Sequence, residues 1–233
     1  PQAGNRQAPA PRNIHAGCHW FFPGPDGEDI PRSRSLAVPR LRVVHAPSFI
    51  IRDWRHWPRE FQRQKLGGAL TLGPAHSYAR VVPADELRRH PAYGVLIGGR
   101  RSPNPGFQRC LGQRGVEDLA VRYCLEFFRA HPEAPLVDLS PNDCEVFCDC
   151  PRCIEANLGH KPQGAERRAS PYWVTRSVFD FANRVAERVG REFPGKLVVV
   201  IAYSRTKSPP RNLRIRDNVL VWYCDQPQEN WQG

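Results

Sequence analysis

The chain has 233 residues, a net charge of +11, and a composition that is 40 % hydrophobic and 24 % charged. These values are typical of a globular protein with a buried core, and they exclude a coiled coil or an intrinsically disordered chain. No apolar run approaches the ~18 residues of a membrane-spanning helix, so we expect no membrane span.

The positive charge is almost all Arg and is scattered along the chain. A nucleic-acid groove needs basic side chains interleaved with aromatic ones, and the nearest candidate is 52–63. In contrast, residues 133–155 contain six acids and one base, a combination that repels phosphate. We therefore expect a solvated basic surface and no specific nucleic-acid partner.

The chain begins with a segment that has no helical or strand periodicity. Residues 1–16 are rich in Pro, Gln, Ala and Asn, and residues 17–39 are rich in Pro and Gly, which exclude a long helix. We interpret 1–39 as a tail and linker from a preceding domain, and 40–233 as the main domain. Because the chain starts at Pro1 and lacks Met, we expect it to be an internal fragment.

From residue 40 onward, strand patterns alternate with helix patterns. The expected strands are 41–51, 69–72, 136–140, 197–203 and 219–224. Two shorter helices are expected over 54–65, ended by Gly67, and over 83–90. A third helix is expected to carry one apolar face, made of Val116, Ala120, Tyr123 and Phe127. A fourth is expected over 171–193, with Ser170 as its N-cap and an apolar face made of Val174, Val178, Phe181, Val185 and Val189.

The strand over 197–203 is apolar on both faces, which is typical of a parallel sheet covered by helices. The expected fold is therefore α/β, with about five βα units. An open doubly wound sheet and part of a (β/α)8 TIM-type barrel both fit this pattern. No GxGxxG motif follows the first strand, so nothing supports a dinucleotide-binding fold.

In both of these architectures, ligands bind at the carboxyl ends of the strands. The residues that follow the expected strands are polar, aromatic and acidic. They are Arg52, Asp53, His76, Ser77, Tyr78, Asn142, Asp143, Tyr203, Ser204, Arg205, Tyr223 and Asp225. Aromatic faces with carboxyl and amide groups suit a sugar, since rings stack on its C–H face and polar groups bind its hydroxyls.

Asp143 is the leading candidate for a general acid, because it follows a buried strand in the most acidic part of the chain. Neighbouring carboxylates and partial burial would raise its pKa, as a general acid requires. An Asx-turn or a helix N-cap is the alternative role. Strand alternation puts Asp138, Ser140 and Asn142 on one side, so Asn142 is the alternative residue to face the pocket.

Two other strand-end residues also have alternative roles. His76 is either a sugar-binding or acid/base group, or a hydrogen-bonded structural histidine. Arg52 either pairs with a substrate carboxylate in bidentate fashion or braces a neighbouring Asp.

The cysteines form a second constellation. Cys148, Cys150 and Cys153 make a C-x-C-x-x-C motif, and Cys144 lies just upstream. A structural zinc site is the favoured interpretation, with a disulfide or separate thiols as alternatives. The fourth ligand would be Cys144 or a distant thiol such as Cys110. Sulfur-only ligation gives a closed site with no position for a catalytic water.

Several separated motifs, in order, resemble one known family. They are GPAHSYARVVPADELRRHPAY (73–93), RCLGQRGVEDLAVRYCLEFFRAHPEAPLVDLSPNDCEVFCDCPRC (109–153) and FANRVAERVGREFPGKLVVVIAYSRTKSPP (181–210), with GCHWFFPGPDGEDIPRSRSLAVP (17–39) upstream. The resemblance covers about residues 17–224 and is to the bacterial domain of unknown function 4838.

The resemblance implies a glycoside-hydrolase-like barrel, akin to those of glycoside hydrolase families 20 and 67, in bacteria that degrade polysaccharides. Such proteins are usually exported. It therefore implies the first part of a (β/α)8-type barrel and hydrolysis of a glycosidic bond in a poly- or oligosaccharide. The reaction class follows from the resemblance by analogy.

By position, the resemblance places His76, Tyr78, Asn142, Asp143 and Tyr203 in family motifs, and it matches Cys110 to a further family cysteine. Together with the strand-end analysis, which contributes Arg52 and Asp225, this gives one set of site residues. Asp143 would be the general acid, and Cys110 becomes the preferred fourth ligand of Cys148, Cys150 and Cys153. The sugar would be oriented by Arg52, His76, Tyr78, Asn142, Tyr203 and Asp225. The second carboxylate would be Asp225 or one from a missing part of the barrel.

Two departures from the family pattern concern these residues. Cys144 stands where the family tends to have glycine after the Asp, so it competes as a metal ligand. Asp225 stands where the family usually has a glutamate. The alternative function is a non-catalytic carbohydrate-binding protein with a structural zinc site. We expect no organic cofactor.

Overall fold

The computed structural model describes residues 18–21, 25–32, 34–35, 51–52, 67–68, 76–157 and 173–224. The chain divides into two compact units, residues 1–72 and 73–233. The domain boundary expected between residues 39 and 40 falls outside the described ranges and stays a prediction.

The first unit contains two small antiparallel strand pairs in its described part. β1 (His19–Trp20) pairs with β2 (Glu28–Asp29) around the 3-10 helix η2 (Pro25–Gly27), and β3 (Ile51–Arg52) pairs with β4 (Gly67–Gly68). The sequence predicts 41–51 as a strand of a parallel sheet, but its described end pairs antiparallel with the two glycines. The expected helix 54–65 and strand 69–72 lie outside the described residues.

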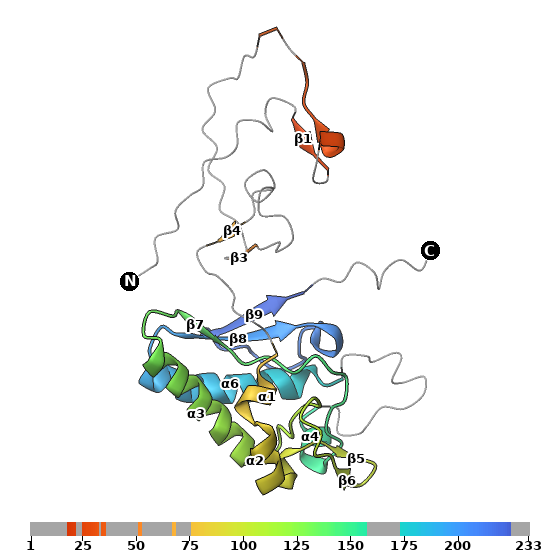
Figure 1. Cartoon of the computed structure of the whole chain (residues 1–233), viewed down its shortest axis with the longest axis vertical. Coiled ribbons are helices and arrows are strands. Elements are labelled where there is room, and N and C mark those ends of the chain that lie inside the picture. The colour runs from red at the N-terminus through yellow and green to blue at the C-terminus, as the bar shows by residue number, and fades with distance from the viewer. Residues whose placement is uncertain are drawn as a thin grey trace. The chain divides into compact units, whose positions relative to one another are not determined.

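The second unit is built on a three-stranded parallel sheet (Figure 1). The strands are β7 (Leu136–Asp138), β8 (Leu197–Ala202) and β9 (Val219–Tyr223), in the order β7-β8-β9. Val137 is paired with Val198, and Val198 with Val219. β8 is buried on both faces from its second residue onward, as its continuous apolar run predicts.

Two long helices cover one face of this sheet, α3 (Arg114–Ala130) and α6 (Thr175–Glu192) (Figure 1). The residues expected on the inner face of α6 are all buried, which confirms that pattern. In α3 the buried stripe consists of Val116, Ala120, Val121, Cys124 and Phe128. Tyr123 and Phe127, expected on that stripe, are only half-buried and pack against the core from its border.

The ends of the helices differ from the sequence expectation in one place. The described part of the long helix begins at Thr175, after a turn at 173–174, whereas the sequence predicts a start at Pro171. Ser170 and Pro171 themselves lie outside the described residues. The short helix expected over 83–90 is present as α2 (Ala84–Arg89), and it ends before Pro91, as a proline requires.

The remaining elements of the second unit are short. They are α1 (Tyr78–Val81), η4 (Pro91–Tyr93), β5 (Leu96–Ile97), β6 (Arg100–Arg101), α4 (Pro151–Glu155) and η5 (Ser204–Thr206). β5 and β6 form an antiparallel hairpin whose two turn residues, Gly98 and Gly99, both have positive φ. Such a turn matches the twist of the paired strands and strongly favours glycine.

The described part of the chain is thus a mixed α/β structure, as predicted. Three of the five expected strands share one parallel sheet, and none of the described sheets closes on itself. The connection from β8 to β9, residues 203–218, contains η5 and no α-helix. The closed or partial barrel is therefore not shown by this fold and belongs to the proposals below.

Candidate metal centre and strand-end hollow

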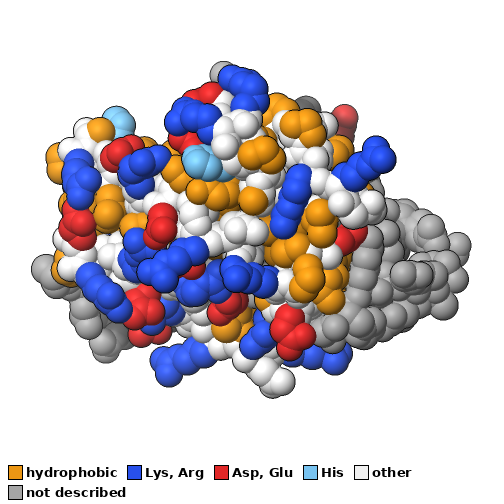
Figure 2. Space-filling model, turned by 90° about the horizontal axis from the view of Figure 1, so that it is seen from below, with side chains coloured by type: hydrophobic (Ala, Val, Ile, Leu, Met, Phe, Trp, Pro, Cys, Tyr) orange, Lys and Arg blue, Asp and Glu red, His pale blue; other side chains and the backbone are white. Residues whose placement is uncertain are grey.

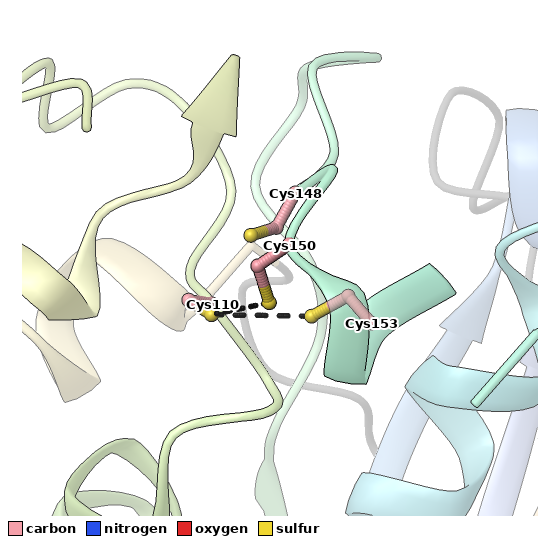
Figure 3. A group of neighbouring side chains, drawn as sticks. All are labelled: Cys110, Cys148, Cys150 and Cys153. Atoms are coloured by element: carbon pink, nitrogen blue, oxygen red, sulfur yellow. Dashed lines mark hydrogen bonds between the residues drawn. The ribbon is translucent and has the colours of Figure 1, made fainter. Parts of the chain in front are cut away.

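Four cysteines converge in the second unit, beside the β5–β6 hairpin (Figure 3). The Sγ atoms of Cys110, Cys148, Cys150 and Cys153 all lie within 4.8 Å of one another, and all four side chains are buried. The Cys110 Sγ lies 3.5 Å from the Cys150 Sγ and 3.9 Å from the Cys153 Sγ. These separations exceed the ~2.05 Å of a disulfide bond. They bracket the ~3.8 Å between sulfurs around a tetrahedral zinc ion with ~2.3 Å bonds.

The local structure explains how these cysteines meet. Cys110 follows the isolated bridge between Gly94 and Arg109, and its N–H donates to the Tyr93 carbonyl (2.9 Å). Cys150 is the N-cap of α4, and Cys153 lies in the helix itself. A Cβ on Gly112 would lie 2.9 Å from the Cβ of Arg152 and 3.4 Å from the Cys153 Sγ, so only glycine lets the Cys110 loop approach α4 this closely.

Two donors lie against the Cys148 sulfur. The Leu96 N–H donates to it at 3.2 Å, and the Arg101 guanidinium lies 3.6 Å from it while also donating to the Gly94 carbonyl. Hydrogen bonds from the thiols of Cys110 and Cys153 lower the pKa of Cys148. Four thiolates around Zn²⁺ carry a net negative charge, so the adjacent guanidinium would stabilise a loaded centre. The donor set fits zinc in a closed structural site.

Cys144, the competing fourth ligand, lies outside this cluster. Its Sγ accepts the Val146 N–H (3.3 Å), and the residue lines a different feature of the unit. The structure therefore brings Cys110, and not Cys144, to the C-x-C-x-x-C motif. The other cysteine buried in the sheet core is Cys124, and burial raises the pKa of its thiol.

Cys144 instead lines a hollow of about 140 Å³ at the carboxyl ends of β7 and β8. We call it the strand-end hollow. It is lined by His76, Gln108, Pro141, Asn142, Asp143, Cys144, Glu145, Phe147, Ile201, Tyr203, Ser204, Arg205 and Thr206. Four of the residues that the sequence predicts for a sugar site, His76, Asn142, Asp143 and Tyr203, thus line one surface.

His76 is held in an unusual conformation at the edge of the hollow. Its φ is +67°, in the left-handed region that non-glycine residues seldom adopt. The Nδ1 atom lies 2.7 Å from the Pro141 carbonyl oxygen, so Nδ1 carries the proton and Nε2 is left to accept or exchange one. The ring lies edge-on to Tyr203, with centroids 6.1 Å apart. Strained backbone at an open hollow is typical of functional sites.

Two carboxyl groups of the hollow have different environments. Asp143 is exposed, so the partial burial expected for it is wrong, and no hydrogen bond or ion pair joins its side chain to another described residue. Glu145 is also exposed, but it accepts hydrogen bonds from Ser204 (2.7 Å) and Arg205 (2.7 Å). Asp143 is therefore accessible to a ligand, whereas the charge of Glu145 is paired with a guanidinium.

The other expected site residues are placed differently. Tyr78 is 1 % exposed, packs edge-on against Phe181 in the core, and does not line the hollow. Asn142 lines it but is buried, with its amide bonded to backbone groups of Ala79 and Phe107. The side chain of Arg52 and all of Asp225 lie outside the described residues.

Sequence reasoning missed two buried polar residues beside the hollow, Gln108 and Arg109, which are 1 % and 2 % exposed. The guanidinium of Arg109 donates to the carbonyls of Val82, Phe107 and Pro105, and burial lowers its pKa to about 10. Neither residue belongs to a periodic pattern or a metal motif. Their adjacency to Cys110 was the only available signal.

The comparison with known families identifies the chain's class. The family described as Domain of unknown function (DUF4838) matches residues 22–230. The chain belongs to this family, which confirms the resemblance seen in the sequence. No curated protein and no solved structure matches the chain. In the described part of the chain, every helix is too short or too polar to cross a bilayer.

Proposed function

We propose that this protein hydrolyses glycosidic bonds in a poly- or oligosaccharide, with Asp143 as the general acid. The observation that carries the proposal is that His76, Asp143 and Tyr203 line one hollow at the carboxyl ends of two adjacent parallel strands. That edge is where parallel α/β folds place their ligands. The three strands would be consecutive strands of a (β/α)8-type barrel, because they follow chain order.

The chemistry of the hollow supports a sugar ligand. Tyr203 and His76 offer ring faces and edges for the C–H surface of a sugar, and Ser204, Arg205 and Glu145 offer polar groups for its hydroxyls. Glycoside hydrolysis needs two carboxyl groups in different protonation states. Asp143 would donate the proton to the leaving oxygen. Glu145, or Asp225, would serve as the base or nucleophile.

The metal centre would have a structural role. The four cysteines would hold a zinc ion through sulfur alone, which supplies structural cross-linking between the Cys110 loop and α4 and leaves no open coordination position. All steps of bond cleavage would therefore fall to the side chains of the strand-end hollow. A polysaccharide substrate would be met outside the cell, which agrees with an exported protein.

The test is to measure reducing-end release from a panel of oligosaccharides by the wild type, Asp143→Asn and the matched control Asp217→Asn. Asp217 is 95 % exposed and pairs with Arg214, outside the hollow. We expect Asp143→Asn to lower kcat by about 10²- to 10⁴-fold, the range for loss of a general acid, and Asp217→Asn to keep wild-type activity. Equal activity in all three proteins would contradict the role of Asp143.

A non-catalytic carbohydrate-binding protein is the second candidate, favoured by the bonds that keep Glu145 engaged with Ser204 and Arg205. It predicts sugar binding, measured by calorimetry, without hydrolysis by the wild type. In that case Asp143→Asn would leave the affinity unchanged, whereas Tyr203→Ala would weaken it.

A further inference from the structure

We propose that Gln108 and the metal centre form a two-point clamp that positions residues 142–147 and so aims Asp143 into the strand-end hollow. The inference rests on the proposed function only for the chemical role of Asp143. The coupling between the metal centre and this loop is a separate physical claim, and it is tested without any substrate.

The first point of the clamp is the buried side chain of Gln108. Its Nε2 donates to the carbonyls of Asn142 (2.7 Å) and Cys144 (2.5 Å), and its Oε1 accepts the Asn142 N–H (2.9 Å). These bonds attach the residues on both sides of Asp143. A single amide thereby fixes the backbone from which the Asp143 side chain extends, and it leaves that side chain exposed.

The second point of the clamp is the cysteine cluster. Cys110 lies two residues after Gln108, and Cys148 and Cys150 lie four and six residues after Cys144. The two segments that carry Gln108 and Asp143 therefore both run directly into the metal centre. Between the two points, the Gln108 N–H reaches the Val146 carbonyl at 3.4 Å, a long backbone hydrogen bond.

The Gln108 segment is itself anchored to the rest of the unit. Arg109 is buried and binds the Val82 carbonyl through two nitrogens, at 2.9 and 3.1 Å. Cys110 is held by the Tyr93 carbonyl. Consecutive residues thus point in three directions, Gln108 to the hollow, Arg109 to the end of α1 and Cys110 to the metal centre. A zinc ion would join the 142–150 segment to this fixed platform.

A direct consequence concerns the free energy of local opening. Loops open by breaking a few hydrogen bonds and contacts, without global unfolding. With both points of the clamp in place, opening of 142–147 must break the Gln108 bonds while its downstream end is fixed by the metal. Without the metal, the downstream end is free to separate from Cys110, and the Gln108 bonds become easier to break.

The experiment is hydrogen–deuterium exchange on the full chain, loaded with Zn²⁺ or stripped by a chelator under reducing conditions. We expect the amides of 142–147 to exchange about tenfold faster, or more, after stripping, since roughly one hydrogen bond's worth of protection is lost. The central strand β8 (Leu197–Ala202) is the internal reference, and it should stay folded and exchange much more slowly than the loop in both states. Equal exchange of the loop with and without zinc overturns the proposal, and so does a chain that binds no zinc.

The variant arm uses Gln108→Met, which removes the amide at similar volume, and Gln113→Met as the matched control. The Gln113 side chain makes no capping hydrogen bond at the start of α3. In the zinc-loaded protein, Gln108→Met should speed exchange of 142–147 about tenfold while Gln113→Met leaves it unchanged. Unchanged exchange in Gln108→Met overturns the clamp. If Gln108→Met does not fold, the comparison of loaded and stripped wild type decides alone.

The outcomes separate this inference from the proposed function. Zinc-dependent protection of 142–147 in a protein that hydrolyses no glycan supports the clamp and contradicts the hydrolase. Hydrolysis by a protein whose 142–147 loop exchanges equally with and without zinc supports the proposed function and contradicts the clamp. If both claims hold, stripping zinc should lower kcat, because Asp143 loses its fixed position. The far-UV circular dichroism should not change, because the sheet and its helices stay folded.

Discussion

The second unit contains two regions that are stabilised in different ways. In the sheet region, β7, β8 and β9 pack under α3 and α6, and its core cluster is large and almost wholly apolar. In the metal region, around β5, β6 and α4, the core cluster has five buried residues, Val95 and the four cysteines. Hydrophobic burial stabilises the first. The second buries too little carbon to do the same.

The difference shows what each region requires from the sequence. A small cluster needs cross-links, and a metal held by the four cysteines would supply them. In the metal region, buried polar side chains also bind backbone carbonyls, as Gln108 and Arg109 do. Arg101, on the hairpin, lies beside Cys148, where it would complement the negative charge of a metal-loaded centre. The sheet region has no need of such devices, because each of its long helices buries a continuous stripe.

The largest expected effect comes from breaking the metal region. Cys110→Ser removes a ligand, so we expect loss of bound zinc and a fall in the free energy of unfolding of about 5 kcal/mol or more at saturating zinc. Metal analysis and urea unfolding with added zinc measure both. Cys124→Ala is the matched control, since Cys124 is equally buried but lies on the inner face of α3, in the core of the sheet region.

For Cys124→Ala we expect an unchanged zinc content of close to one per chain. In the presence of a strong chelator, the wild type and Cys110→Ser should unfold at nearly the same urea concentration, because both then lack the metal. A Cys110→Ser protein that retains a full complement of tightly bound zinc would show that the cluster does not use this cysteine.

The next effect comes from breaking the sheet region. Phe128 is fully buried and contacts Phe127 and Phe193. Phe128→Ala should lower the free energy of unfolding by about 3–5 kcal/mol, through lost burial and a cavity, while zinc content stays unchanged. Leu213→Ala, at a half-buried position beside the same core, should cost clearly less. An equal cost in the two variants would argue against a tightly packed core here.

Phe128 also illustrates which parts of the fold were predictable. The spacing of Val116 and Ala120 predicts a helix and places its buried face correctly to within one residue position. It places Phe127 on the buried stripe, whereas the structure buries its neighbour Phe128, and composition cannot decide between them because both are apolar. That choice depends on how α3 sits against α6 and β7, which is a tertiary property. The strands β7, β8 and β9 were predictable because continuous apolar runs are a local signal.

The residues of the candidate sites also differ in whether the sequence could predict their roles. The C-x-C-x-x-C spacing predicts a metal centre from local sequence, and strand ends predict that His76, Asp143 and Tyr203 lie near one another. Tyr78 could not be excluded from the site, because its position after a strand end gives no sign that α1 turns it into the core. Gln108 was missed because its function arises from contacts with residues 34 and 36 positions away.

The smallest predicted effect concerns a buried carboxyl group where the sheet region meets the hollow. Asp138 is the last residue of β7, and its side chain is only 10 % exposed. One oxygen accepts a hydrogen bond from Ser140, and Arg80 lies 3.5 Å from the other. That second oxygen and the Tyr78 hydroxyl are both buried without a hydrogen-bond partner among the described residues. Burial raises the pKa of Asp138 despite the hydrogen bond from Ser140.

A carboxyl group whose pKa is raised by folding stabilises the protein while it is protonated, and that contribution is lost as the pH rises through the folded-state pKa. Asp138→Asn keeps a neutral, hydrogen-bonding group at every pH. We therefore expect the variant to be more stable than the wild type at pH 7, by about 1 kcal/mol, and the gap to close below about pH 4. Urea unfolding at the two pH values measures this, with Asp217→Asn as the exposed control that shows no such closing gap. A variant less stable than the wild type at pH 7 would mean that the ion pair with Arg80 outweighs the cost of burying the charge.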